Sequence, residues 1–134
     1  MTAFSFALED YADFVRDNPE DFDGIYRKIV HEVPRFLMAV EPERRAAVLE
    51  AAPSLTGTRW DALLAGLAEH LAGLHGLEVP AWCDEPGRFV DPPWVVIEAV
   101  GSRSVVRAPG AFLRHGALPD PMDLDARGGE PEPW

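Results

Sequence analysis

Residues 58–76 read TRWDALLAGLAEHLAGLHG, and this stretch carries the clearest helical pattern in the chain. Its large apolar side chains recur every three or four positions, which is the period of a helix that buries one face. Gly76 follows the last of them and suits the left-handed residue that commonly ends a helix. We therefore expect a helix from Thr58 to about His75. Its buried stripe would consist of Trp60, Leu63, Leu64, Leu67, Leu71 and Leu74.

A second apolar period lies upstream of this helix. Pro19 is well placed as the first residue of a helix, because its missing N–H needs no partner there, and Glu20 and Asp21 follow in the first turn. Pro34 interrupts the pattern, and it either kinks this helix or begins a new one. The apolar face should pack against the stripe described above to form the core. It consists of Phe22, Ile25, Tyr26, Ile29, Val30 and Val33.

Two shorter helices are expected on either side of this second period. The segment from Ser5 to Asp17 has apolar residues on one face, and Ser5 can cap its first turn. The sequence Glu-Pro-Glu at 41–43 is typical of another helix start, and Pro53 should end that helix. Its alanines indicate a small and closely packed buried face.

The character of the sequence changes after the long helix. Residues 77–110 contain five prolines, which prevent long helices, together with Trp82 and Trp94, which favour burial. We therefore expect an ordered segment that wraps around the helical core. Two extended pieces are expected within it, at Trp94–Ile97 and Ser104–Val106. Two short helices should follow, at Pro109–His115, ended by Gly116, and at Pro121–Ala126, capped by Asp120.

These patterns predict a mainly all-α fold with a Pro/Trp-rich, partly extended C-terminal segment. With 134 residues, the chain is long enough for one domain with a single core. We expect residues 1–128 to form that domain, with the helical core at 5–76 and the Pro/Trp-rich wrap at 77–128. Residues 129–134 are expected to form a flexible tail.

The chain is strongly acidic, with 12 Lys and Arg against 23 Asp and Glu and a formal net charge of −11. Such a chain repels the phosphates of nucleic acids and anionic membranes unless it segregates a basic patch, and its longest basic run is the pair at 44–45. No stretch approaches the ~20 apolar residues of a membrane span, and the N-terminus lacks the basic region of a signal peptide. We therefore expect a cytoplasmic protein that binds neither nucleic acid nor membrane.

Acidic residues concentrate in the first 24 positions, where Arg16 is the one basic residue. They can form a docking face for a basic protein, because opposite charges speed encounter and help to select the partner. The alternative is a solvated helix face, whose carboxylates serve solubility and favour helix N-termini. The candidate partner-binding residues are Glu9, Asp10, Asp13, Asp17, Glu20, Asp21 and Asp23, with Trp82 and Trp94 as further contacts.

Histidine and cysteine form no recognisable catalytic pattern. His70 and His75 are five positions apart, or about 500° around a helix, so they do not match the spacing of a two-histidine zinc motif. Cys83 is followed by Asp84 and Glu85, whose negative charges would raise the pKa of the thiol and keep it unreactive. As the single cysteine, it also forms no internal disulfide, and we expect it to be structural.

The remaining acidic clusters match no metal or cofactor site either. Asp120, Asp123 and Asp125 resemble a calcium loop superficially, but the central glycine and the terminal glutamate are missing, and Pro121 occupies an early position. No cluster is followed by a glycine-rich loop that could hold a phosphate. The sequence therefore predicts no catalytic residue, no metal and no cofactor.

Several short motifs follow one another in the second half of the chain. They are RWDALLAGLAEHL at 59–71, LEVPAW at 77–82, PW at 93–94, AFLRHG at 111–116 and DLDA at 123–126. In this order they resemble a helical module of high-GC actinobacteria. There the module often follows a helix-turn-helix domain of the Xre type and lies beside a nucleotidyltransferase-type toxin of the AbiE-like class. The resemblance implies an antitoxin-like or regulatory helical domain, and it names no catalytic residues.

No helix-turn-helix pattern precedes the module in this sequence. The expected function is therefore a non-catalytic, antitoxin-like module that neutralises or regulates a basic partner protein, such as a nucleotidyltransferase-type toxin, without contacting DNA. One alternative is a small-ligand binder or enzyme, with a pocket lined by Trp60, Trp82, Trp94 and a histidine. The other is a transcriptional regulator domain, which would need its arginines to converge into a basic stripe. Those arginines are Arg44, Arg45, Arg59, Arg103, Arg107 and Arg114.

Overall fold

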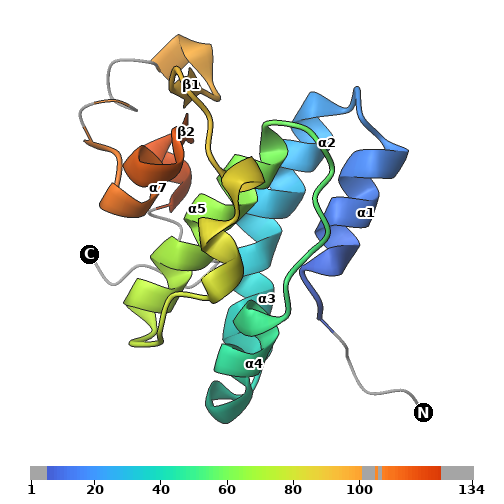
Figure 1. Cartoon of the computed structure of the whole chain (residues 1–134), viewed down its shortest axis with the longest axis vertical. Coiled ribbons are helices and arrows are strands. Elements are labelled where there is room, and N and C mark those ends of the chain that lie inside the picture. Colours follow the sequence, from blue (N-terminus) through green and yellow to red (C-terminus); the bar gives the residue numbers. More distant parts are fainter. Residues whose placement is uncertain (1–5, 101–104, 106, 125–134) are drawn as a thin grey trace.

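The computed structural model describes residues 6–100, 105 and 107–124, and it confirms the mainly α-helical fold (Figure 1). The α-helices are α1 (Glu9–Asp17), α2 (Phe22–Tyr26), α3 (Val33–Ala39), α4 (Arg45–Glu50), α5 (Trp60–Leu74), α7 (Gly110–His115) and α8 (Pro121–Leu124). A π-helical turn, η1 (Arg27–Glu32), joins α2 to α3. Short 3-10 turns are η2 (Pro42–Arg44), η3 (Ala81–Asp84), η4 (Pro86–Arg88) and η5 (Glu98–Val100), and the strands are β1 (Trp94–Val95) and β2 (Ala117–Leu118).

The predicted long helix, α5, is the central element. It packs against α7, β2, η3 and η4, and the column formed by α2 and α3 lies on its other side (Figure 1). The predicted stripe is buried except for Leu74, which is 61% exposed. Residues 60–68 are buried on every side, because alanine and glycine between the leucines allow neighbours to approach closely. The one-faced pattern of the sequence therefore understated how deeply this helix lies in the core.

The end of α5 confirms the predicted glycine stop. Gly76 has a φ of +69°, the Leu77 N–H donates to the Ala72 carbonyl (2.7 Å), and the Gly76 N–H donates to the Gly73 carbonyl (3.3 Å). This paired pattern gives hydrogen-bond partners to carbonyls that the end of a helix otherwise leaves unpaired. It also directs the chain into the Pro/Trp-rich segment.

The second predicted helix runs through α2, η1 and α3 without a break, so of the two alternatives left open at Pro34 the helix continues past this residue. Within it, the Val33 N–H donates to the carbonyl of Lys28, five residues back. This wider turn lies just before Pro34, which has no N–H and would clash with a carbonyl four residues earlier in a regular α-helix. The π-helical turn therefore accommodates Pro34, and no separate helix begins there.

The start of this helix differs from the prediction. It begins at Phe22 and not at Pro19, because the Asp21 side chain caps it by accepting a hydrogen bond from the Gly24 N–H (3.1 Å). The first helix is confirmed as α1, which ends at Asp17 as predicted but begins at Glu9, later than predicted. Ser5, its predicted cap, lies outside the described residues. The next short helix is confirmed by η2 and α4.

The strands β1 and β2 pair in parallel, with Trp94 opposite Ala117 and Val95 opposite Leu118. β1 confirms the extended conformation predicted from Trp94 onward, over its first two residues. β2 was not predicted, because it is only two residues long and contains no β-branched or aromatic side chain. The pairing fastens the segment before η5 onto the end of α7.

The remaining C-terminal predictions have mixed outcomes. The extended piece predicted around Val105 is wrong at that residue, which is helical. The two predicted short helices are confirmed as α7 and α8: Gly116 ends α7 with a φ of +79°, and the Asp120 carboxylate accepts a hydrogen bond from the Met122 N–H (3.0 Å) at the start of α8. Residues 125–134, with the predicted tail, lie outside the described residues.

One cluster of buried side chains extends from Leu8, just before α1, to Leu118 in β2. The Pro/Trp-rich segment contributes to it as predicted, through residues such as Trp82 and Val96. Among the described residues, no helix combines the length and the apolar character needed to cross a bilayer.

Candidate functional site

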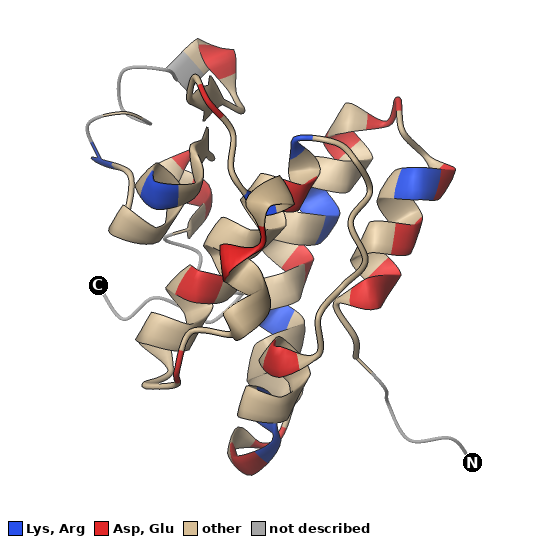
Figure 2. Ribbon diagram, viewed as in Figure 1, with Lys and Arg blue, Asp and Glu red and all other residues tan. Residues whose placement is uncertain are grey.

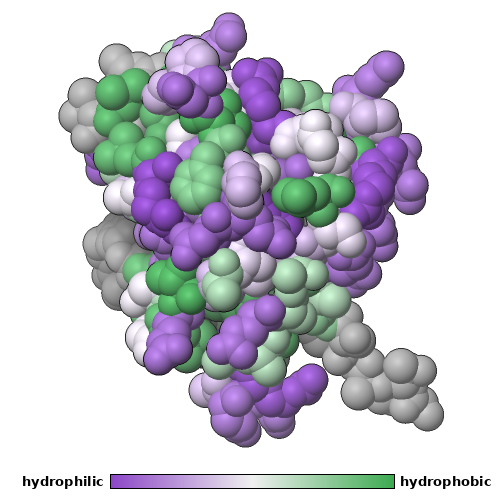
Figure 3. Space-filling model, in the orientation of Figure 1, coloured by the Kyte–Doolittle hydropathy of each residue, from purple (hydrophilic) through white to green (hydrophobic). Residues whose placement is uncertain are grey.

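Six of the predicted partner-binding carboxylates lie together on α1, the following turn and the first turn of α2. We call this surface the acidic corner, and all of its residues are exposed: Asp10, Asp13, Asp17, Glu20, Asp21 and Asp23. Acidic segments follow α1 and the turn into α2 (Figure 2). Hydrophilic side chains also dominate this edge of the molecule in the space-filling view (Figure 3).

The charge of the acidic corner is poorly compensated. Asp13 forms an ion pair with Arg16 (2.7 Å), and Asp21 is engaged in capping α2. Within the described part of the chain, no cation lies within 4.0 Å of the other four carboxylates, which are Asp10, Asp17, Glu20 and Asp23. The acidic corner therefore presents a net negative charge to solvent.

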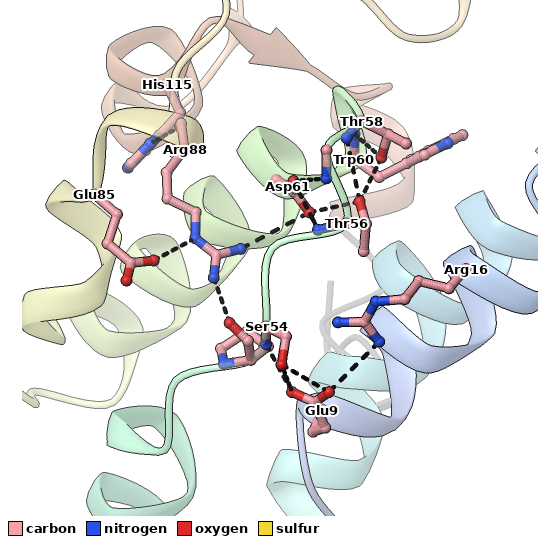
Figure 4. Close-up of polar contacts among 12 residues, drawn as sticks. Glu9, Arg16, Ser54, Thr56, Thr58, Trp60, Asp61, Glu85, Arg88 and His115 are labelled. Carbon is pink, nitrogen blue, oxygen red and sulfur yellow. Dashed lines mark hydrogen bonds and ion pairs between the residues drawn. The ribbon is translucent and has the colours of Figure 1, made fainter.

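Glu9, the seventh predicted carboxylate, has a different role. It accepts hydrogen bonds from the Ser54 N–H (2.6 Å) and hydroxyl (3.0 Å), and Arg16 lies 3.5 Å away (Figure 4). The backbone hydrogen bond from Ser54 is the main cause that lowers the pKa of Glu9, with burial acting against it. Glu9 thus ties α1 to the segment between α4 and α5.

The two tryptophans named as further contacts differ in position. Trp82 is only 6% exposed, and its indole N–H donates to the Leu49 carbonyl (2.7 Å), so it belongs to the core and offers little surface to a partner. Trp94 is half-buried, with its ring edge-on to Trp60 and under the guanidinium of Arg59 (4.3 Å). Of the pair, Trp94 keeps some accessible surface.

A polar cluster that includes a buried histidine lies where α5 meets α7. The His115 side chain is fully buried, with Nε2 2.8 Å from the Glu69 carboxylate and Nδ1 2.7 Å from the Arg88 carbonyl. Arg114 bridges Glu69 (2.8 Å) and Asp84 (2.9 Å). Burial opposes ionisation of Glu69, but the hydrogen bonds from Arg114 and His115 outweigh it, so the pKa of Glu69 lies below its usual value.

This cluster and the nearby thiol do not form a working nucleophile. Both ring nitrogens of His115 face acceptor oxygens, so neither is free to accept a proton from a thiol. Cys83 is buried and donates a weak hydrogen bond to the Ala65 carbonyl (3.7 Å). Burial, helped by the charge of Glu69, raises the pKa of Cys83 to about 12, so the reactive thiolate is scarce at neutral pH.

A buried arginine organises the segment between α4 and α5. Arg88 lies over the ring of Trp82 and donates to the Pro53 carbonyl and to Glu85 (3.1 Å), and its Nη1 lies 4.0 Å from Asp61 (Figure 4). Asp61 in turn accepts hydrogen bonds from two backbone N–H groups and a hydroxyl of that segment. These donors are Thr56 N–H (3.0 Å), Gly57 N–H (2.9 Å) and Thr56 Oγ1 (2.7 Å).

The sequence did not predict the roles of the buried groups Asp61, Arg88 and His115. Asp61 had one detectable signal: a threonine at 58 followed three positions later by an acidic residue is typical of a helix N-terminus. Arg88 and His115 had none that indicates burial. The Pro53 carbonyl and Glu69 are distant in sequence, and the local pair of Arg88 with Glu85 is equally typical of an exposed turn.

The two histidines whose spacing does not match a zinc motif both lie at a cavity between α3, α5 and α8. The cavity has a volume of about 260 Å³, and His70 and His75 are among its lining residues, together with Arg45 and Asp123. It contains no tryptophan, so it is not the Trp/His-lined pocket considered from the sequence. Among the described residues, no group of three or more His, Cys, Asp or Glu side chains is placed to hold a metal ion.

Comparisons of the chain with known proteins found no match. No known protein family matches the chain, and no curated protein or solved structure matches it either. The functional argument therefore depends on the residues and contacts described above.

Proposed function

We propose that this protein is a non-catalytic binding module that engages a basic partner protein through the acidic corner. The exposure of that corner carries the proposal. Four of its carboxylates face solvent with no cation in reach among the described residues, so their charge is available to the lysines and arginines of a partner. Such complementarity raises the rate of encounter and disfavours wrong partners.

An antitoxin-like role is the specific form of this proposal. Enzymes that transfer nucleotides hold phosphates with basic residues, and an acidic protein can occupy such a surface in place of the phosphates. The resemblance of residues 59–126 to the actinobacterial module supports the same role. The partner would then be a basic nucleotidyltransferase-type toxin.

The arrangement of the arginines supports DNA binding less well than the acidic corner supports binding of a basic protein. Arg114 is paired with Glu69 and Asp84, and Arg45 donates to backbone carbonyls at the end of α3. Arg59 stacks on Trp94. Because these three side chains are engaged on different elements, they do not line up as a basic stripe within the described part of the chain. Arg103, another arginine of the predicted stripe, lies outside the described residues.

Co-expression with the proteins encoded by neighbouring genes tests the proposal. We expect a basic neighbour to co-purify at low ionic strength, and its dissociation constant to rise at least about tenfold between 50 and 300 mM salt, since screening weakens exposed charge pairs. An unrelated basic protein should bind far more weakly. Failure of every basic neighbour to bind in low salt, or binding that salt does not weaken, would contradict the proposal.

A further inference from the structure

We propose that the cavity between α3, α5 and α8 is a binding site for a small carboxylic acid with an apolar body about the size of one aromatic ring. The site is separate from the acidic corner. Its inner surface is mostly apolar, and a few polar side chains converge on it, which is the usual composition of a small-molecule site. The apolar lining consists of Pro34, Met38, Leu67, Leu71, Leu74 and Leu124.

The volume sets the size of the ligand. A cavity of about 150 Å³ is known to hold benzene, so the 260 Å³ here leaves room for one ring and a short polar group. Leu74 and Met38 both line the cavity and are 61% and 37% exposed, which places the opening of the cavity to solvent beside them. Apolar side chains left exposed around an opening favour entry of an apolar ligand, because its binding removes their surface from water.

The charges at the cavity favour an anion over a cation. Arg45 uses Nε and Nη2 to donate to the carbonyls of Val40 and Met38 (2.9 Å each), and its Nη1 lies 3.5 Å from His75. No carboxylate among the described residues lies within 4.0 Å of this guanidinium, so within this part of the chain no ion pair neutralises its positive charge. A carboxylate is the group that a guanidinium binds best.

The negative charge at the cavity is already stabilised. The Asp123 carboxylate accepts a hydrogen bond from the Tyr26 hydroxyl (2.6 Å), and its other oxygen lies 3.6 Å from His31. A ligand cation would therefore gain less from Asp123 than a ligand anion gains from Arg45. Burial lowers the pKa of His70, which disfavours the charged form of this lining ring and leaves Arg45 as the main source of positive charge among the lining residues.

Three probes with the same ring and different charge test the charge preference in calorimetric titrations at about 0.15 M salt, where long-range repulsion from the acidic chain is screened. Phenylacetate should bind with a dissociation constant below about 1 mM, and 2-phenylethanol about tenfold more weakly. Phenethylamine should bind more weakly still. Equal affinity for phenylacetate and phenethylamine, or no binding of phenylacetate at about 10 mM, would overturn the proposal.

Matched variants test the place of binding. Leu74→Trp enlarges an exposed side chain at the cavity opening and should reduce phenylacetate affinity at least about tenfold. Leu113→Trp enlarges a similarly exposed side chain that does not line the cavity, and it should leave the affinity unchanged. If the two variants bind phenylacetate equally well, the site is not in this cavity.

The substitution Arg45→Gln distinguishes the effect of the positive charge on binding from an effect of misfolding. It should weaken phenylacetate about tenfold and leave 2-phenylethanol unchanged, because the neutral probe needs the cavity and not the charge. Retained binding of 2-phenylethanol shows that the cavity of the variant is intact. If Arg45→Gln lowers the affinity for both probes by the same factor, or for neither, Arg45 does not recognise the carboxylate.

Discussion

At Gly116 the backbone leaves α7 with a φ of +79°, and a Cβ there would lie 2.1 Å from the Val90 carbonyl oxygen. Both the conformation and the contact require glycine. We expect Gly116→Ala to lower the free energy of unfolding by about 2–4 kcal/mol. Gly73→Ala is the control, since apart from its neighbours in the chain and the backbone of its own helix no atom lies within 4 Å of its Cβ position, and it should raise stability by about 0.5–1 kcal/mol. Urea unfolding that moves both variants in the same direction would contradict this explanation.

Glu69 is expected to make stability depend on pH. Its folded pKa lies below the unfolded value of 4.5, so its contribution is complete above that value and is lost as the pH falls through the lower, folded pKa. Glu69→Gln should therefore cost about 1 kcal/mol at pH 7, and the difference from the unmodified protein should shrink in acid. Urea unfolding midpoints at pH 7 and at about pH 3 measure this, with exposed Glu43→Gln as control. If the stability difference between Glu69→Gln and the unmodified protein is the same at both pH values, the predicted role of Glu69 is wrong.

The burial of single polar residues was the feature of the structure that the sequence predicted least well. Arg88 and His115 look like ordinary surface residues in their local sequence, yet both are fully buried. Their partners are the Pro53 carbonyl and Glu69, which are far away along the chain. No local period or cap pattern carries such long-range pairing.

At the scale of elements, the segment between α4 and α5 depends on Asp61. This carboxylate is 3% exposed and receives hydrogen bonds from the segment on one side, with Arg88 on the other. Asp61→Ala should cost about 3 kcal/mol or more, because it leaves Arg88 buried with one charge partner fewer. Asp84→Ala removes an aspartate that is exposed and pairs with Arg114, so thermal unfolding should change little. Similar losses of stability from Asp61→Ala and Asp84→Ala would contradict this prediction, because they would show that the cost of removing an aspartate does not depend on its burial.

Elements were predictable where the signal was local. α5 was predicted from its own apolar period and from Gly76, and both are properties of neighbouring residues. The π-helical turn before Pro34 was not predicted. A proline inside a helical pattern indicates only that the hydrogen bonding must change there. β2 was also missed, because its two residues are extended only by virtue of pairing with β1.

At the scale of the whole molecule, the acidic corner differs from the carboxylates that hold elements together. Carboxylates near the core, such as Asp61 and Glu69, are paired or hydrogen-bonded and hold elements together. The carboxylates of the acidic corner are exposed and largely uncompensated. The sequence located the acidic residues of this surface within the first 24 positions, because charge and helical period are both local properties. It could not separate Glu9 from the rest, since Ser54 is brought to it only by the fold.

The measurement that tests the central claim most directly compares two variants in titrations with the co-purified basic partner. One variant neutralises the uncompensated carboxylates of the acidic corner: Asp10→Asn, Asp17→Asn, Glu20→Gln and Asp23→Asn. The other removes the same number of charges from exposed positions elsewhere: Glu41→Gln, Glu43→Gln, Glu50→Gln and Glu78→Gln. We predict that the first variant binds at least about tenfold more weakly and the second within about twofold of the unmodified protein. Equal weakening by the two variants would contradict the claim, because it would mean that total charge, and not the acidic corner, governs binding.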